Sequence, residues 1–87
     1  MDFEYDPAKS ASNREKHGID FLAAQALWLD DRLIEVPANT EDEPRFLAVG
    51  KIAGKHWAAV FTRRGAKIRI ISVRRARKQE VARYESV

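Results

Sequence analysis

Basic side chains are concentrated near the C-terminus, in the segment KIRIISVRRARKQEVARY that runs from Lys67 to Tyr84. Arg69 lies on an apolar, strand-like run, and four further cations follow within five positions: Arg74, Arg75, Arg77 and Lys78. A guanidinium group binds two phosphate oxygens through its planar fork and keeps its proton at neutral pH. The segment therefore predicts contact with a phosphate-rich partner.

RNA cleavage is a reaction that such cations can support. Without a metal it requires a base for the 2′-hydroxyl, an acid for the leaving 5′-oxygen and cations around the phosphate. The residues that we predict to hold the phosphate are Arg63, Arg69, Arg74 and Arg75. The residues that we predict to transfer protons or to orient the arginines are His17, Glu80 and Tyr84.

Each of these three residues also has a structural interpretation. His17 stands at the end of a predicted helix, where an imidazolium can bind the last carbonyl groups. Glu80 can form a salt bridge with Arg77 or Arg83 on a helix surface, or it can hold an active-site arginine in place. Tyr84 can pack at the edge of the core; with a free phenol pKa near ~10, it suits an acid or a phosphate ligand better than a base.

Other side chains extend the predicted RNA surface. The further residues that we predict to bind RNA are Lys9, Lys16, Arg77 and Lys78. Lys9 and Lys16 share one helix face, although simple solvation of both lysines is the alternative. Trp28 and Trp57 can stack on bases, but we interpret them as packing residues because a helix and a strand of this pattern need core aromatics. We interpret His56 as a surface residue.

No metal site and no cofactor are predicted. The acidic runs Asp30-Asp31 and Glu41-Asp42-Glu43 contain no histidine and no helical i, i+4 pair. We interpret them as solubilising charge or as a contact for a basic partner. A glycine-rich phosphate loop is also missing from the sequence, which argues against nucleotide-dependent chemistry.

Length and composition bound the class of protein. The 87 residues, of which 45% are hydrophobic and 33% charged, predict one globular domain over residues 1–87 with a thin core. The chain has no cysteine, so neither a disulfide nor thiolate chemistry is available. No apolar run approaches the ~18 residues that span a bilayer, and the N-terminus is acidic, so we expect a cytoplasmic protein without a membrane partner.

Charge is distributed unevenly along the chain. Residues 1–44 carry four basic and eleven acidic side chains, a net charge of −7, whereas residues 45–87 carry twelve basic and two acidic ones, a net charge of +10. Such asymmetry indicates a nucleic acid or a charged protein partner. Pairing between the two halves within the molecule is the alternative, and we expect it to explain part of the asymmetry.

Cap and turn signals define the first half of the chain. Phe3 to Tyr5 alternate like a short strand. Asp6 and Pro7 predict a helix over residues 7–17 that Gly18 ends, and Asp20 predicts a second helix over 20–29. Residues 31–37 are typical of a strand and residues 38–44 of an acidic loop.

The second half predicts a β-meander and a last helix. Three β-rich runs at 45–52, 55–63 and 67–73 are separated by short turn sequences that suit tight hairpins. Strict alternation in the last run would place Ile68, Ile70 and Ser72 on one face and Arg69, Ile71 and Val73 on the other. The last helix is predicted over 74–85. The fold class is therefore α+β, a twisted antiparallel sheet with two N-terminal helices packed on one face and a C-terminal helix.

Two stretches of the sequence resemble the BrnT family of toxins. The first is Lys16-His17-Gly18-Ile19 followed by Phe21; the second is RIIS at 69–72, then Arg74-Arg75-Ala76, with Glu80 and Tyr84 at fixed distances beyond. Weaker matches at 5–9, Asn13, 45–46, Gly50 and 62–63 extend the resemblance over nearly the whole chain.

The resemblance implies a fold related to the RelE ribonucleases and a type II toxin that cleaves RNA. It also implies a BrnA antitoxin with a ribbon-helix-helix DNA-binding end, encoded beside the toxin. That partner would neutralise the toxin, and the complex would bind operator DNA through the antitoxin and repress its own operon. A homodimer within the complex is plausible by the same analogy.

Two other hypotheses remain open from the sequence. The same arginines would serve a non-catalytic module that binds nucleic acid or an acidic antitoxin segment and cuts nothing. In a third version the toxin fold survives only as the scaffold of a repressor complex.

Overall fold

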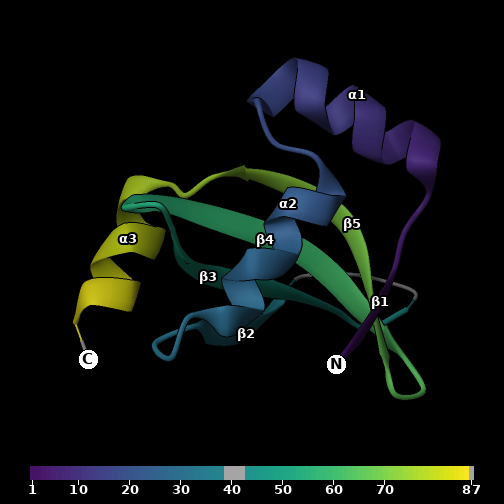
Figure 1. The fold of residues 1–87 in the computed structure, drawn as a ribbon. Coiled ribbons are helices and arrows are strands. Elements are labelled where there is room, and N and C mark those ends of the chain that lie inside the picture. Colours follow the sequence, from purple (N-terminus) through teal and green to yellow (C-terminus); the bar gives the residue numbers. More distant parts are fainter. Residues whose placement is uncertain (39–42, 87) are drawn as a thin grey trace.

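A computed structural model describes residues 1–38 and 43–86 and shows one five-stranded sheet with helices on its faces (Figure 1). The strands are β1 (Asp2–Glu4), β2 (Ile34–Ala38), β3 (Arg45–Ile52), β4 (Lys55–Arg64) and β5 (Lys67–Arg75). The helices are α1 (Pro7–His17), α2 (Phe21–Ala24), the 3₁₀ helix η1 (Gln25–Leu29) and α3 (Lys78–Glu85). None of these helices is long and apolar enough to cross a membrane.

The sheet has the order β1-β5-β4-β3-β2 and confirms the α+β class. Strands β2 to β5 form the predicted antiparallel meander. Strand β1, however, pairs with β5 in parallel, so the sheet is mixed rather than purely antiparallel. Ala53 and Gly54 form the first hairpin turn, both with positive φ (51° and 80°), which matches the twist of the flanking strands.

Caps set the helix boundaries as the sequence predicts. The Asp6 side chain accepts from the backbone N–H of Ala8 at the start of α1, and Gly18 ends α1 with φ 81°. Asp20 caps α2 in the same way through Ala23. The predicted helix over 20–29 tightens to 3₁₀ geometry from Gln25.

The tightening from α2 to η1 has a packing consequence. In a 3₁₀ helix, residues three apart lie over one another. Leu27 thereby follows Ala24 on the buried side, and both have no exposed surface. The core they enter also contains Phe21, Phe61 and the apolar residues of β5. Figure 1 shows α2 and η1 crossing this face of the sheet, with α3 beside the end of β5.

Aromatic side chains fill the space between these helices and the sheet. Trp28 packs edge-on against Phe3 and Phe61, with ring centroids 5.2 and 5.3 Å away. Trp57 packs against the same core cluster from β4. Both tryptophans therefore occupy the packing positions that we predict, rather than an open stacking surface.

A β-bulge at Ile71 changes the alternation of β5. Phe61 pairs with Ile70 and Val60 pairs with Ser72, so Ile71 has no partner on β4. The extra residue reverses the side-chain phase along the rest of the strand. Val73 therefore joins Ile68 in the core beneath the helices, where both are almost completely buried. The predicted faces are wrong beyond Ile70.

The boundary between β5 and α3 also differs from the prediction. Arg74 pairs with Ala58 and Arg75 with Trp57, which keeps both arginines in the strand. The helix begins only at Lys78, with Arg77 as its N-cap residue. The local sequence fits either a strand end or a helix start, and pairing with β4 decides for the strand.

The segment between η1 and β3 is described in part. The strand predicted over 31–37 runs from Ile34 to Ala38. It begins late because the backbone N–H groups of Arg32 and Leu33 donate hydrogen bonds to Asp30 and form a turn. Residues 39–42 of the predicted loop lie outside the described residues.

Internal pairing accounts for part of the charge asymmetry. Among the described residues, ion pairs join the acidic first half of the chain to the basic second half: Arg69 with Glu4, Arg63 with Glu35, and Arg64 with Glu43. The alternative raised from the sequence is therefore correct for these residues. Other cations of the second half remain exposed at the surface.

Candidate active site and RNA interface

The four arginines predicted to hold the phosphate divide between the two faces of the sheet. Arg74 pairs with Ala58, which packs with Val49 and Tyr84 on the α3 side. Arg69 pairs with Thr62. Thr62 follows the core residue Phe61 in β4, so Thr62 and Arg69 face away from the core under α2 and η1, toward the α3 side. Arg69 and Arg74 thus share one face of the sheet.

Arg63 and Arg75 lie on the opposite face. The Arg63 guanidinium sits 5.6 and 5.4 Å from the ring centres of Phe46 and Phe61 and pairs with a glutamate of β2. The Arg75 guanidinium lies 5.4 Å from the Trp57 ring and donates from Nε to a carbonyl oxygen of β4. The structure therefore does not bring all four arginines around one phosphate.

Arg74 is held by a carboxylate from the next element. Its two terminal nitrogens donate to the two oxygens of Glu80 at 2.8 and 2.9 Å, a bidentate arrangement. Only 23% of the Arg74 side chain and 14% of the Glu80 side chain are exposed. Glu80 also accepts from the backbone N–H of Arg77 at 2.8 Å, which fixes the start of α3.

This pair shifts the ionisation of both partners. Hydrogen bonds from Arg74, opposed by burial, lower the pKa of Glu80, and the same contact raises the pKa of Arg74. Both groups are therefore charged at neutral pH. Of the two interpretations of Glu80 from the sequence, the geometry favours the one in which it holds an arginine in place.

Arg69 is oriented by a second carboxylate. Its Nη1 donates to Glu4 of β1 at 2.7 Å, and both side chains are about one third exposed (33% and 30%). Five positions of strand separate Arg69 from Arg74, which corresponds to roughly 15 Å at the usual rise per residue. Two guanidinium groups at that spacing suit different phosphates of one RNA strand better than a single phosphate.

A cleft of about 190 Å³ opens between α1 and β5, beside the position that separates the two arginines. Its lining consists of Lys9, Ser12, Asn13, Lys16, His17, Ile71 and Ser72. The two lysines and His17 are exposed, and within the described part of the chain they have no hydrogen-bond or ion-pair partner. The structure thus gathers two lysines that we predict to bind RNA and the histidine that we predict to transfer a proton or to orient an arginine.

Asn13 holds this cleft together, a role that sequence reasoning missed. Its amide nitrogen donates to the carbonyls of Ile19 (2.8 Å) and Val73 (2.9 Å), and its oxygen accepts from the Val73 N–H (3.1 Å). The amide occupies the edge of β5 in place of a neighbouring strand. A polar residue on the inward face of α1, beside buried Ser10, was the available signal.

The comparison with known families gives a match over most of the chain. The family model described as the ribonuclease toxin BrnT of type II toxin-antitoxin systems matches residues 5–80. The chain belongs to the BrnT family. It is accordingly a ribonuclease toxin of a type II system, for which an antitoxin is the partner. No curated protein matches the chain.

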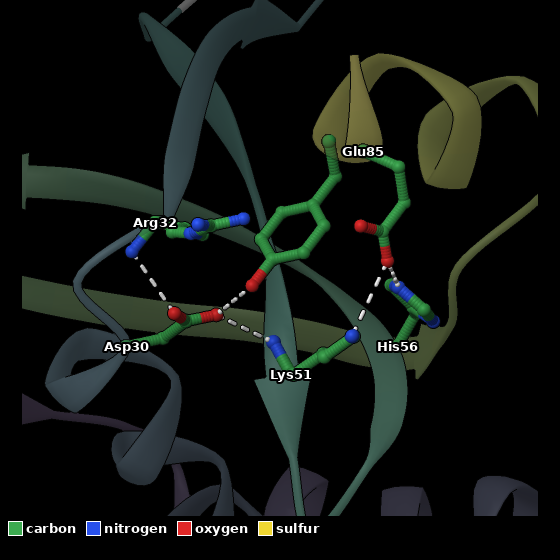
Figure 2. A network of polar contacts seen from close by, with 6 residues as sticks. Asp30, Arg32, Lys51, His56 and Glu85 are labelled. Carbon is green, nitrogen blue, oxygen red and sulfur yellow. Dashed lines mark hydrogen bonds and ion pairs between the residues drawn. The ribbon is translucent and has the colours of Figure 1, made fainter. Parts of the chain in front are cut away.

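The matched segment of this BrnT protein includes the α1–β5 cleft, Arg69, Arg74 and Glu80 and ends before Tyr84. Tyr84 is only 4% exposed and packs with Val49 and Ala58. Its hydroxyl donates to Oδ2 of Asp30 at 2.6 Å, at the end of η1, and Figure 2 shows the network around this carboxylate. Tyr84 therefore packs at the edge of the core, which is one of the two interpretations made from the sequence.

Asp30 links three elements of the BrnT fold. Besides Tyr84, its oxygens accept from the backbone N–H of Lys51 (2.8 Å) and of Arg32 (2.9 Å). Burial opposes ionisation, but these hydrogen bonds outweigh it and lower the pKa of Asp30. The hydrogen bond to Asp30, followed by burial, raises the pKa of Tyr84 to about 12. The interpretation of Asp30 as merely solubilising charge is wrong.

His56 and Glu85 complete the network in Figure 2. The Glu85 carboxylate lies 2.7 Å from Nε2 of His56 and 3.3 Å from Nζ of Lys51, and these contacts lower the pKa of Glu85. His56 also stacks edge-on against Tyr84. These contacts attach the last turn of α3 to β3 and β4, so His56 has a structural partner on the surface.

The remaining predicted RNA contacts lie where β5 joins α3. Arg77 and Lys78 are exposed there and extend the positive surface beyond Arg74. Among residues 1–38 and 43–86, no group of three or more potential metal ligands occurs. Glu41 and Asp42 of the acidic run lie outside the described residues.

Proposed function

We propose that this BrnT toxin is an endoribonuclease that cleaves RNA without a metal ion, at the edge of β5 between Arg69 and Arg74. The bidentate contact of Glu80 with Arg74 carries the proposal. An arginine fixed before substrate arrives can stabilise developing phosphate charge without reorganising. Arg69, oriented by Glu4, would bind a neighbouring phosphate of the same strand.

His17 is the proton-transfer residue of this proposal. It is exposed and lines the cleft with Ser72, which stands between the two arginines in the sequence. Imidazole suits proton transfer at neutral pH because its ordinary pKa lies near ~6.5. In the reaction the 2′-oxygen attacks phosphorus as its proton leaves, and the 5′-oxygen departs with a proton.

The other predicted residues have supporting parts. Lys9 and Lys16 line the cleft and would bind the RNA backbone, as would Arg77 and Lys78 at the start of α3. Glu80 acts by positioning Arg74, and Tyr84 acts by holding α3 in place rather than by proton transfer. Arg63 and Arg75 lie on the sheet face away from Arg69 and Arg74. Their contact with phosphate is a separate prediction.

The experiment is incubation of purified protein with RNA in EDTA. We expect cleavage to persist without divalent metal, and Arg69→Ala and Arg74→Ala each to lower its rate about a hundredfold or more. Arg64→Ala is the matched control, because Arg64 is also ion-paired but lies outside the proposed site. Cleavage that depends on added metal, or equal cleavage by all three variants, would contradict the proposal.

A non-catalytic binding module is the second candidate. The exposed cations of the cleft and of the β5–α3 junction support it equally well. It predicts intact RNA after long incubation together with binding that weakens steeply as salt rises, since each neutralised phosphate releases counterions. Salt-titrated binding beside the cleavage assay separates the two functions.

The antitoxin partner is proposed to be of the BrnA type, with a ribbon-helix-helix end that binds operator DNA. The complex would act in the cytoplasm, neutralise the toxin and repress its operon, with two toxin copies brought together by the antitoxin. Sequencing the adjacent reading frame tests this directly. A neighbour without a ribbon-helix-helix pattern would exclude the BrnA assignment.

A further inference from the structure

The outer side of α2 and η1 carries apolar side chains that contact no core. Leu22 is 65% exposed and Leu29 is 84% exposed, and apart from Met1 they are the exposed large hydrophobic residues of the described chain. Ala26 and Leu29 are three apart in η1 and therefore lie over one another. Because Ala24 and Leu27 face the core, this stripe faces solvent.

The stripe borders a groove of about 360 Å³ between η1 and the β3–β4 turn. Ala26, Leu29, Ile52 and Ala53 supply its apolar lining, and Asp30, Lys51 and Tyr84 its polar lining. Asp30 and Tyr84 already bond to each other and Asp30 to the Lys51 backbone. A ligand therefore meets mainly apolar surface.

Ala53 is placed in this groove at a conformational cost. It is the one non-glycine residue with positive φ (51°) among residues 1–38 and 43–86. An L-residue in this region costs about 1 kcal/mol, and glycine or asparagine is the usual choice. Retaining a methyl group at such a position indicates that the side chain has a use beyond the turn.

An unpaired cation, Arg32, lies beside the groove, next in the sequence to the exposed Asp31. Figure 2 shows the Arg32 side chain on this side of the molecule, and its positive charge acts on Tyr84. Within the described residues its guanidinium has no ion-pair partner, whereas Asp30 and Glu85 nearby are both engaged. An occupant that carries a carboxylate close to its apolar residues would complement this rim.

We propose that the groove is a docking site for the antitoxin, through an amphipathic acidic helix. Two apolar side chains of the antitoxin helix, one turn apart, would pack against Leu29, Ile52 and Ala53. A carboxylate of the same helix would face Arg32. Helices commonly bind grooves in this way. The inference uses the membership of a type II system and the antitoxin partner, and it is independent of the RNA site on β5.

Single thiols test the proposal, because the chain contains no cysteine. We would introduce Leu29→Cys and, as the control, Ala66→Cys in the distant β4–β5 turn. The probe is the purified antitoxin encoded beside the toxin gene. At saturation we expect alkylation of the thiol at position 29 to slow at least tenfold and that at position 66 to stay unchanged.

Affinity provides the second measurement. Leu29→Asp and Arg32→Glu are expected to weaken antitoxin binding at least tenfold, and Lys67→Glu, at the opposite end of the sheet, to leave it unchanged. Because the Leu29 side chain is exposed, we expect its substitution to leave folding intact, and a thermal unfolding curve checks this. RNA cleavage is assayed in parallel, so a failure of the proposed nuclease is seen separately.

Three results would overturn the docking site. An unchanged alkylation rate at position 29 in the saturated complex would show that the antitoxin does not cover this residue. Protection that appears on raising the toxin concentration alone would assign the groove to a second copy of the chain. Protection by RNA without antitoxin would assign it to nucleic acid.

Discussion

The phenolic hydroxyl of Tyr84 donates a 2.6 Å hydrogen bond to the carboxylate of Asp30, 54 positions earlier in the chain. This contact joins α3 to the end of η1, and Asp30 in turn binds the backbone of β3. The first and last parts of the BrnT fold are thereby connected at one carboxylate. The same helix presents Glu80 to Arg74.

Tyr84→Phe is expected to lower the free energy of unfolding by about 2 kcal/mol, because a hydrogen bond to a charged group is lost and a partly buried carboxylate oxygen loses a donor. Urea unfolding measures the change. Tyr5→Phe is the matched control, since Tyr5 contacts the core through its ring against Phe21. Equal effects of the two substitutions would refute a special role for the Tyr84 hydroxyl.

Alkaline pH is expected to destabilise the protein through the same group. The pKa of Tyr84 rises from 10.0 to about 12 on folding, so the folded state holds this proton more tightly than the unfolded state. The associated stability is complete below pH ~10 and is lost as the pH rises toward ~12. The free energy of unfolding, measured at several pH values across this window, should fall more steeply for wild type than for Tyr84→Phe. An equal dependence on pH for the two proteins would contradict this.

Glu80→Gln is expected to lower RNA cleavage about tenfold or more, because a neutral amide no longer holds the Arg74 guanidinium through two charged hydrogen bonds. Arg74→Lys should have a similar effect, since an ammonium group has no planar fork. The control is Glu85→Gln, which breaks an exposed ion pair on the same helix. Initial rates with one RNA substrate decide, and a larger loss in the control would count against Glu80 as a positioning residue.

Asn13→Ala is expected to cost about 3 kcal/mol of unfolding free energy, because buried backbone groups of Val73 and Ile19 lose their partners. Ser12→Ala, at the neighbouring exposed position, should change stability by less than about 0.5 kcal/mol. Hydrogen exchange provides the local readout. The Val73 amide should lose protection in the Asn13 variant, and retained protection would show that another group caps the strand edge.

Ala53→Gly is expected to stabilise the protein by about 1 kcal/mol, because glycine accepts the positive φ of the turn without steric cost. Ala66→Gly in the other hairpin should not stabilise, since Ala66 has no such conformation. Thermal unfolding compares the two. If Ala53→Gly were neutral or destabilising, its methyl group would be contributing to packing within the monomer.

The sequence predicts most elements of the fold but not their junctions. Asp6, Pro7 and Gly18 determine the first helix by local capping, and Ala53-Gly54 determines a hairpin by local turn geometry. The bulge at Ile71 depends on pairing with a separate strand. No local signal distinguishes a strand end from a helix start at the arginines that follow it.

The candidate site shows the same division between local and long-range information. The types of residue that it needs are visible in the sequence, and the match to Lys16-His17-Gly18 and to the Arg74-Arg75 segment indicates the family. Which arginines share a face depends on the register, which the bulge alters. The contact of Tyr84 with Asp30 joins residues too far apart for spacing arguments.

The unpaired residue in β5 divides the strand into two segments with opposite alternation. Without the bulge, regular alternation through Ile71 would turn Val73 outward and bury Arg74, although every residue in the strand would be the same. Deleting Ile71 would instead restore regular pairing with β4 and keep Val73 in the core. The strand therefore accommodates one surplus residue as a local bend, and its match to β4 determines which arginines face solvent.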